Sequence, residues 1–99
     1  MKKFEKIYDI VSSIPKGKIT TYGAIAKLVV VDPRVVGYAL HQNKDPRHIP
    51  CHRVINSKGQ ISSGYVFGGP NTQKEMLEKE GILFDDNEAV NLKRFGYLI

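Results

Sequence analysis

The stretch "YGAIAKLVVVDPRVVGYALHQN", residues 22–43, determines the expected fold. Its apolar residues recur at helical spacing in two short segments, which are separated by a break at Asp32 and Pro33. Asp is a favourable N-cap and Pro suits the first helical position, so a second helix is expected to begin here. The residues expected to face inward are Ala24, Ile25 and Leu28 from the first helix and Val35, Val36, Ala39 and Leu40 from the second. Two short helices joined by a tight turn are typical of a helix-turn-helix, and also of the helical corners of many other small domains.

The flanking segments predict a further helix and a small sheet. On the N-terminal side, helical periodicity predicts an amphipathic helix over residues 3–13, which Pro15 and Gly17 end. On the C-terminal side, "RVINSKGQIS", residues 53–62, alternates around the turn "NSKG" and predicts a β-hairpin with Lys58 at its tip. A hairpin after a helix-turn-helix is a wing. The expected fold is therefore mainly α with a small β-hairpin, a winged helix-turn-helix-like DNA-binding domain.

The last third of the chain predicts a loop, a helix and a tail. The glycine-rich stretch "SSGYVFGGPN", residues 62–71, is expected to be a loop. Asn71 or Thr72 can cap a final helix that ends at Gly81. We expect Met76, Leu77 and Glu80 to face inward from that helix, and an extended tail to pack Leu83, Val90, Leu92 and Phe95.

Length and composition restrict the classes of protein to which the chain can belong. Its 99 residues suit a single domain, 1–99, with one cysteine and a formal charge of +5. A lone cysteine excludes an internal disulfide and a Cys-rich zinc site, and it fits a reducing cytosol. No apolar run is long enough for a membrane span or a signal peptide, so a cytoplasmic location is expected. The positive charge favours a polyanionic partner such as nucleic acid.

The single cysteine, Cys51, lies in "HIPCHRVINSKG", residues 48–59. A buried cysteine often only fills a gap in the core. As a nucleophile it would need a base or a positive charge to form the thiolate, and His52 and Arg53 supply both next to it in sequence. A third group usually orients such a histidine, and Glu80 is a candidate because it ends a helix with an apolar face. The residue types alone leave packing and nucleophilic catalysis both open.

The segment "IPCHRV", residues 49–54, closely resembles the active-site motif of the O6-alkylguanine-DNA alkyltransferases. These repair proteins move an alkyl group irreversibly from a damaged guanine to their own cysteine. The resemblance extends in order over residues 4–82. It includes "IPKGKITTYGAIAKL" (14–28), "RVVGYALHQN" (34–43), "HRVINSKGQIS" (52–62) and "KEMLEKEGI" (74–82).

The resemblance implies a role for each matching residue of the active site. Cys51 would accept the alkyl group, and His52 would be the base, acting through a water. Glu80 would orient His52, and Asn43 would hold the turn between the recognition helix and the active site. Such a single-turnover S-methyltransferase needs no cofactor and no metal.

The resemblance also implies a DNA-binding surface. Tyr22 would help to rotate the target nucleotide out of the duplex, and Arg34 would enter the vacated space. Gly37 and Ala39 would let the recognition helix approach the backbone in the minor groove.

Other residues are expected to contact DNA outside the recognition helix. Lys58 would contact the backbone, and Arg53 could either contact phosphate or be structural. Tyr65 or Phe67 would line the lesion pocket. His41 and His48 match no role and are interpreted as surface residues. The implied partner is double-stranded DNA that contains O6-alkylguanine, for which a monomer suffices.

The chain departs from the alkyltransferase pattern in three ways. It opens directly on the DNA-binding domain, and its loop "SGYVFGGPNTQ", residues 63–73, aligns ambiguously with the substrate loop. Its overall frame resembles the alkyltransferase-like proteins, which flip the lesion and pass it to nucleotide excision repair, and which typically carry tryptophan at the position of Cys51. The alternatives are therefore an alkyl-transferring enzyme, a non-enzymatic lesion-binding protein, and a winged-helix DNA-binding protein without lesion chemistry.

Overall fold

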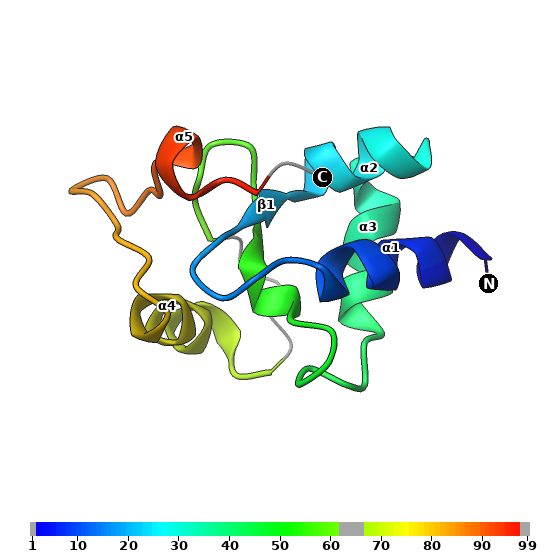
Figure 1. Cartoon of the computed structure of the whole chain (residues 1–99), viewed down its shortest axis with the longest axis horizontal. Helices are drawn as coiled ribbons and strands as arrows, with labels where there is room; N and C mark the ends of the chain where they lie inside the picture. The colour runs from blue at the N-terminus through cyan, green and yellow to red at the C-terminus, as the bar shows by residue number, and fades with distance from the viewer. Residues whose placement is uncertain (1, 62–66, 98–99) are drawn as a thin grey trace.

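The computed structural model describes residues 2–61 and 67–97 and is mainly helical (Figure 1). In Figure 1, α1, α2 and α3 lie together at one end of the molecule and α4 and α5 at the other, with β1 between them. The elements are α1 (Lys2–Ser12), β1 (Thr20–Thr21), α2 (Tyr22–Val29), α3 (Pro33–His41), the 3-10 turn η1 (Cys51–Arg53), β2 (Val54–Ile55), α4 (Gly69–Lys79) and α5 (Leu92–Phe95). No helix in the described ranges is long and apolar enough to cross a membrane.

The helix-turn-helix is confirmed, and side-chain caps set its boundaries. The Thr21 hydroxyl accepts the Ala24 N–H at 3.1 Å, and the Asp32 carboxylate accepts the Arg34 N–H at 2.9 Å. The stripe of α3 faces the core as predicted. On α2, however, the prediction for Ala24 and Leu28 was wrong, because both are exposed while Ala26 and Val29 are buried. Apolar residues fill most positions of this segment, so their spacing did not specify which face packs.

The small sheet forms from different strands than the predicted hairpin. β2 pairs in parallel with β1, in the register Thr20↔Val54 and Thr21↔Ile55. The predicted turn does form, since the Asn56 N–H donates to the Gln60 carbonyl at 3.1 Å. After the turn, Gln60 pairs with Ala89 of the tail instead of returning along β2. The hairpin was wrong because both strands found long-range partners that a local pattern does not reveal.

The tail closes a second hydrophobic cluster beside the helical one. Val90 is buried with Ile19, Ile55, Leu77 and Ile82, and Leu92 and Phe95 pack against this group as expected. Two details differ from the prediction: Leu83 is exposed, and the tail contains the short helix α5. The helix α4 ends at Lys79, and Gly81 follows its C-cap in the left-handed conformation as predicted, but Gly68 stands at its N-cap in place of Asn71 or Thr72.

Gly59 fixes the contact between the turn after β2 and the tail. Its φ is +78°, and a Cβ built on it would lie 2.4 Å from the Val90 carbonyl oxygen. We expect Gly59→Ala to destabilise the protein by about 2 kcal/mol or more, because it combines backbone strain with a backbone clash. Gly23→Ala is the matched control, since its Cβ meets no atom within 4 Å and the residue is helical. Urea denaturation of both variants tests this expectation, and equal stability of the two would contradict it.

Candidate functional site

Cys51 begins η1 and lies at the edge of the helical core, where only 5% of it is exposed. Its N–H donates to the Ile49 carbonyl at 2.7 Å, and the Asn43 side chain donates to the same carbonyl at 2.9 Å. Asn43 also accepts the Asp45 N–H at 2.9 Å. Asn43 is itself buried, so it joins the end of α3 to the segment that carries Cys51. Burial raises the pKa of the Cys51 thiol, and a hydrogen bond from Asn43 offsets part of the rise.

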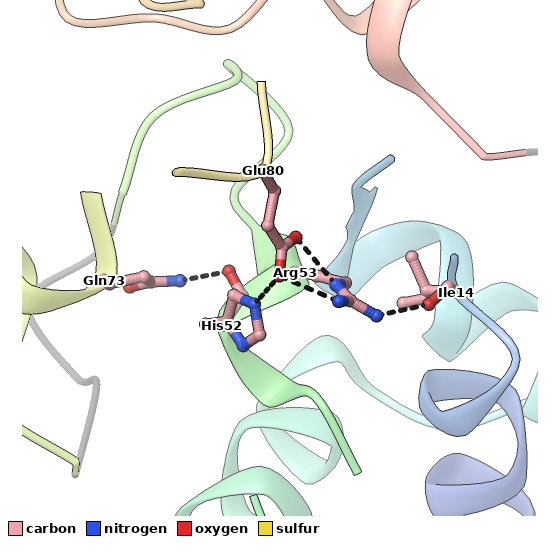
Figure 2. Close-up of polar contacts among 5 residues, drawn as sticks. All are labelled: Ile14, His52, Arg53, Gln73 and Glu80. Carbon is pink, nitrogen blue, oxygen red and sulfur yellow. Dashed lines mark hydrogen bonds and ion pairs between the residues drawn. The ribbon is translucent and has the colours of Figure 1, made fainter. Parts of the chain in front are cut away.

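A buried polar network follows directly after Cys51 (Figure 2). His52 Nε2 lies 2.8 Å from Glu80 Oε2. Arg53 donates two hydrogen bonds to the same carboxylate, from Nε to Oε1 at 2.9 Å and from Nη2 to Oε2 at 2.8 Å. Its third nitrogen, Nη1, donates to the Ile14 carbonyl at 2.8 Å. The side chains of Arg53 and Glu80 are only 16% and 12% exposed. Glu80 therefore joins α4 to the active-site turn, and Arg53 extends the connection to the end of α1.

The charge of Glu80 determines the tautomer of His52. Burial pushes the pKa of Glu80 up, but hydrogen bonds from Arg53 and His52 outweigh it and hold the pKa below its ordinary value of 4.5. The carboxylate is thus ionised at neutral pH and can only accept, so His52 Nε2 carries the proton. In a neutral imidazole the other nitrogen, Nδ1, then keeps its lone pair. Nδ1 is buried and has no hydrogen-bond partner within the described residues.

Gln73 is a site residue that the sequence did not reveal. It is buried, and its amide donates to the carbonyls of His52 at 3.0 Å and Val54 at 3.2 Å. Gln73, Leu77 and Glu80 have the i, i+4, i+7 spacing of one helical face, and this spacing was the signal that could have identified Gln73. Gln73 holds the backbone of the active-site turn against α4.

Three of the predicted DNA-binding residues, Tyr22, Arg34 and Gly37, line a common groove. It has a volume of about 450 Å³ and is lined by residues of α2, α3 and the turn after β2: Tyr22, Gly23, Pro33, Arg34, Gly37, His41, Asn56 and Ser57. We call it the α3 groove. The Arg34 side chain is 83% exposed, and within residues 2–61 and 67–97 its one ion pair is an exposed contact with Asp32 at 3.3 Å. Such a pair is weak, so the Arg34 side chain is available for another partner.

The matching family model, 6-O-methylguanine DNA methyltransferase, DNA binding domain, covers residues 2–82. The chain belongs to this family. It is 44% identical to alkyltransferase-like protein 1 of Schizosaccharomyces pombe over 81 residues, 80% of this chain and 75% of that protein. It is 47% identical to a methylated-DNA–protein-cysteine methyltransferase of Methanocaldococcus jannaschii over 78 residues, 77% of this chain and 44% of that protein. A crystal structure of S. pombe Atl1 in complex with damaged DNA containing O6-carboxymethylguanine superimposes with a TM-score of 0.83 at 36% identity, covering 99% of this chain and 96% of that one.

Within this family frame, the structure brings together one part of the predicted site. Cys51, His52, Glu80 and Asn43 lie around a single turn, with the contacts expected for Glu80 and Asn43. The chain spans less than half the length of the methyltransferase relative and three quarters of the alkyltransferase-like one.

The structure changes the roles of several residues predicted to contact DNA. Ala39 is fully buried in the core and cannot contact DNA, because it belongs to the stripe of α3 that packs inward. Arg53 has the structural alternative as its observed role, since each of its three side-chain nitrogens donates one hydrogen bond to Glu80 or Ile14. His41 is exposed, which confirms its interpretation as a surface residue, and it lines the α3 groove with Gly37.

The remaining predicted residues lie outside these two sites or at their margins. Lys58 is exposed on the turn that borders the α3 groove, and His48 is exposed and pairs with Asp45. Phe67 packs against the helical core, whereas Tyr65 lies outside the described residues. No cluster of His, Cys, Asp and Glu in residues 2–61 and 67–97 could hold a metal ion.

The lowered pKa of Glu80 predicts an acid-dependent loss of stability. A carboxyl whose folded pKa lies below its unfolded value stabilises the fold above the unfolded value, near 4.5 here, and this contribution is lost as the pH falls through the folded pKa. We expect the free energy of unfolding to decline with acid below about pH 5. The decline should be shallower in Glu80→Gln and unchanged in Glu78→Gln, whose side chain is exposed on the same helix. Urea denaturation at a series of pH values measures the free energy of unfolding of the three proteins. If this free energy fell equally steeply with acid in all three, the prediction for Glu80 would be wrong.

Proposed function

We propose that this protein binds DNA containing O6-alkylguanine and transfers the alkyl group to the sulfur of Cys51. The observation that carries the proposal is the buried His52, whose Nε2 contacts Glu80 and whose Nδ1 has no hydrogen-bond partner among the described residues, directly after Cys51 in the chain. His52 takes the thiol proton through a water, and the thiolate attacks the alkyl carbon. The new S–C bond forms as the O6–C bond breaks, and the departing guanine takes a proton. The cysteine stays alkylated, so each molecule reacts once.

The α3 groove supports the DNA-binding part of the proposal. Gly37 leaves open space on the exposed side of α3, where a Cβ would meet no atom within 4 Å. A mid-helix glycine costs about 0.5–1 kcal/mol relative to alanine, so its presence fits a surface that a DNA backbone approaches closely. Arg34 borders the same groove and can enter the duplex when the damaged base is rotated out.

Intact mass after reaction with damaged DNA tests the transfer step. The protein is incubated with a duplex containing one O6-methylguanine, and we expect a gain of one methylene. The same duplex with guanine, and the Cys51→Ala variant with the damaged duplex, are the controls and should leave the mass unchanged. Tight lesion binding without a mass change would reject alkyl transfer.

A second candidate function is non-enzymatic lesion recognition, with the flipped base presented to nucleotide excision repair proteins. It is favoured by the similarity to S. pombe Atl1, which extends over nearly the whole of both chains. The low exposure of Cys51 also favours it, because an alkyl group must reach a buried sulfur. The mass experiment separates the two functions, since both predict preferential binding of the damaged duplex but only the first predicts a modified cysteine.

A further inference from the structure

A second groove lies between α1 and the end of α2. It has a volume of about 430 Å³, and we call it the α1–α2 groove; its lining residues are Lys3, Lys6, Asp9, Ile10, Leu28, Val29 and Val30. Leu28 is 53% exposed and Val30 80% exposed, and they are two of the four exposed large hydrophobic side chains in the described residues. Neither the helical core nor the second cluster uses these two side chains.

Val30 occupies a backbone conformation that valine avoids. It is the C-cap of α2, with φ 63° and ψ 57° in the left-handed region. Glycine or asparagine is the usual residue there, and a β-branched side chain makes the conformation costly. The side chain gains little from burial in return, since it is 80% exposed. A strained apolar residue that the fold does not bury points to a contact outside the fold.

The α1–α2 groove is held in shape and is separate from the α3 groove. Lys3 Nζ donates to the Val29 carbonyl at 2.9 Å, and the N–H of Val31 donates to the Ala26 carbonyl at 3.0 Å. The first bond joins α1 to the end of α2, and the second closes the end of α2 itself. None of the lining residues is shared with the α3 groove, so an occupant of one groove need not displace an occupant of the other.

We propose that the α1–α2 groove binds an acidic amphipathic helix of a partner protein. Leu28 and Val30 form an exposed apolar strip. A partner helix can pack its apolar side chains at positions i, i+3 and i+7 against such a strip. Lys3 and Lys6 outnumber Asp9 along the rim, and the whole chain carries +5, so negative charge beside the anchors is favoured. The same charge opposes a second copy of this chain as the occupant. The exposed apolar strip distinguishes the groove from a phosphate-binding surface.

The test uses a synthetic helical peptide with Leu at the three anchor positions and Glu at the flanking positions. Its binding to the full chain is followed by amide chemical shifts and by fluorescence anisotropy. We expect shifts at Leu28 and Val30, and no binding of the matched peptide with Lys in place of Glu. Absence of shifts at these two residues, or equal binding of both peptides, would overturn the proposal.

Val30→Asn separates binding from folding, because asparagine suits the left-handed backbone but removes the apolar contact. We expect its Tm to rise by about 4 °C. Peptide affinity should fall about tenfold, while affinity for the damaged duplex stays unchanged. Leu83→Asn, which alters an exposed leucine far along the chain from the groove, is the control and should bind the peptide normally. A lower Tm with unchanged peptide affinity would show that Val30 stabilises the fold and does not bind the peptide. Weaker binding of the damaged duplex would show that the groove contacts DNA. Either outcome overturns the proposal.

Discussion

Glu80→Gln is expected to destabilise the protein by about 3–5 kcal/mol at neutral pH, the typical cost of breaking a buried ion pair. The substitution keeps the size of the side chain but removes the charge that the Arg53 fork and His52 share. The guanidinium of Arg53 would remain largely buried without a compensating anion. The free energy of unfolding, obtained from urea denaturation, measures the loss.

Glu78→Gln is the matched control, because Glu78 lies on the same helix with an exposed side chain. Its stability should change by less than about 0.5 kcal/mol, as is usual for surface substitutions. If Glu80→Gln proved as stable as Glu78→Gln, the network in Figure 2 would contribute nothing to the fold. Glu80 would then act on His52 alone.

The helices α1 to α4 were predictable because most of the signals that begin and end them are local. Asp32 and Pro33 start α3, and Gly81 ends α4, through contacts within a few residues. The sheet was not predictable, because β1 and β2 are more than thirty residues apart and their partners depend on how the helices pack. The same limit explains α2, where a nearly continuous apolar segment leaves the buried face to be chosen by α1 and α3.

The candidate site, too, was predictable only where the signal is local in sequence. Cys51, His52 and Glu80 were identified through a motif, and the structure places His52 against Glu80. The roles of Arg53 and Gln73 depend on contacts with Ile14 and with the backbone of the active-site turn, which are distant in sequence. Arginine beside an active-site turn in a DNA-binding family suggested phosphate contact, and only the fold shows that each of its side-chain nitrogens donates to Glu80 or Ile14.

His52→Gln is expected to slow alkyl transfer by about 10²–10⁴-fold at neutral pH, the usual contribution of a general base. Burial raises the pKa of Cys51, so few molecules hold a thiolate unless a base removes the proton. Glutamine can still bond to Glu80 but offers no imidazole nitrogen. Single-turnover kinetics by intact mass, with a duplex containing O6-methylguanine, give the rate, and His48→Gln is the control because His48 is exposed and pairs only with Asp45 among the described residues.

The pH dependence of the variant distinguishes a base from a merely structural residue. If His52 acts by removing the thiol proton, raising the pH does the same work, and the rate of His52→Gln should climb about tenfold per pH unit toward the raised pKa of Cys51. Affinity for the damaged duplex should stay close to that of the unmodified protein throughout. A variant that stays slow at high pH, although it is folded and binds the lesion, would mean that His52 positions the turn and that the thiol proton leaves by another route.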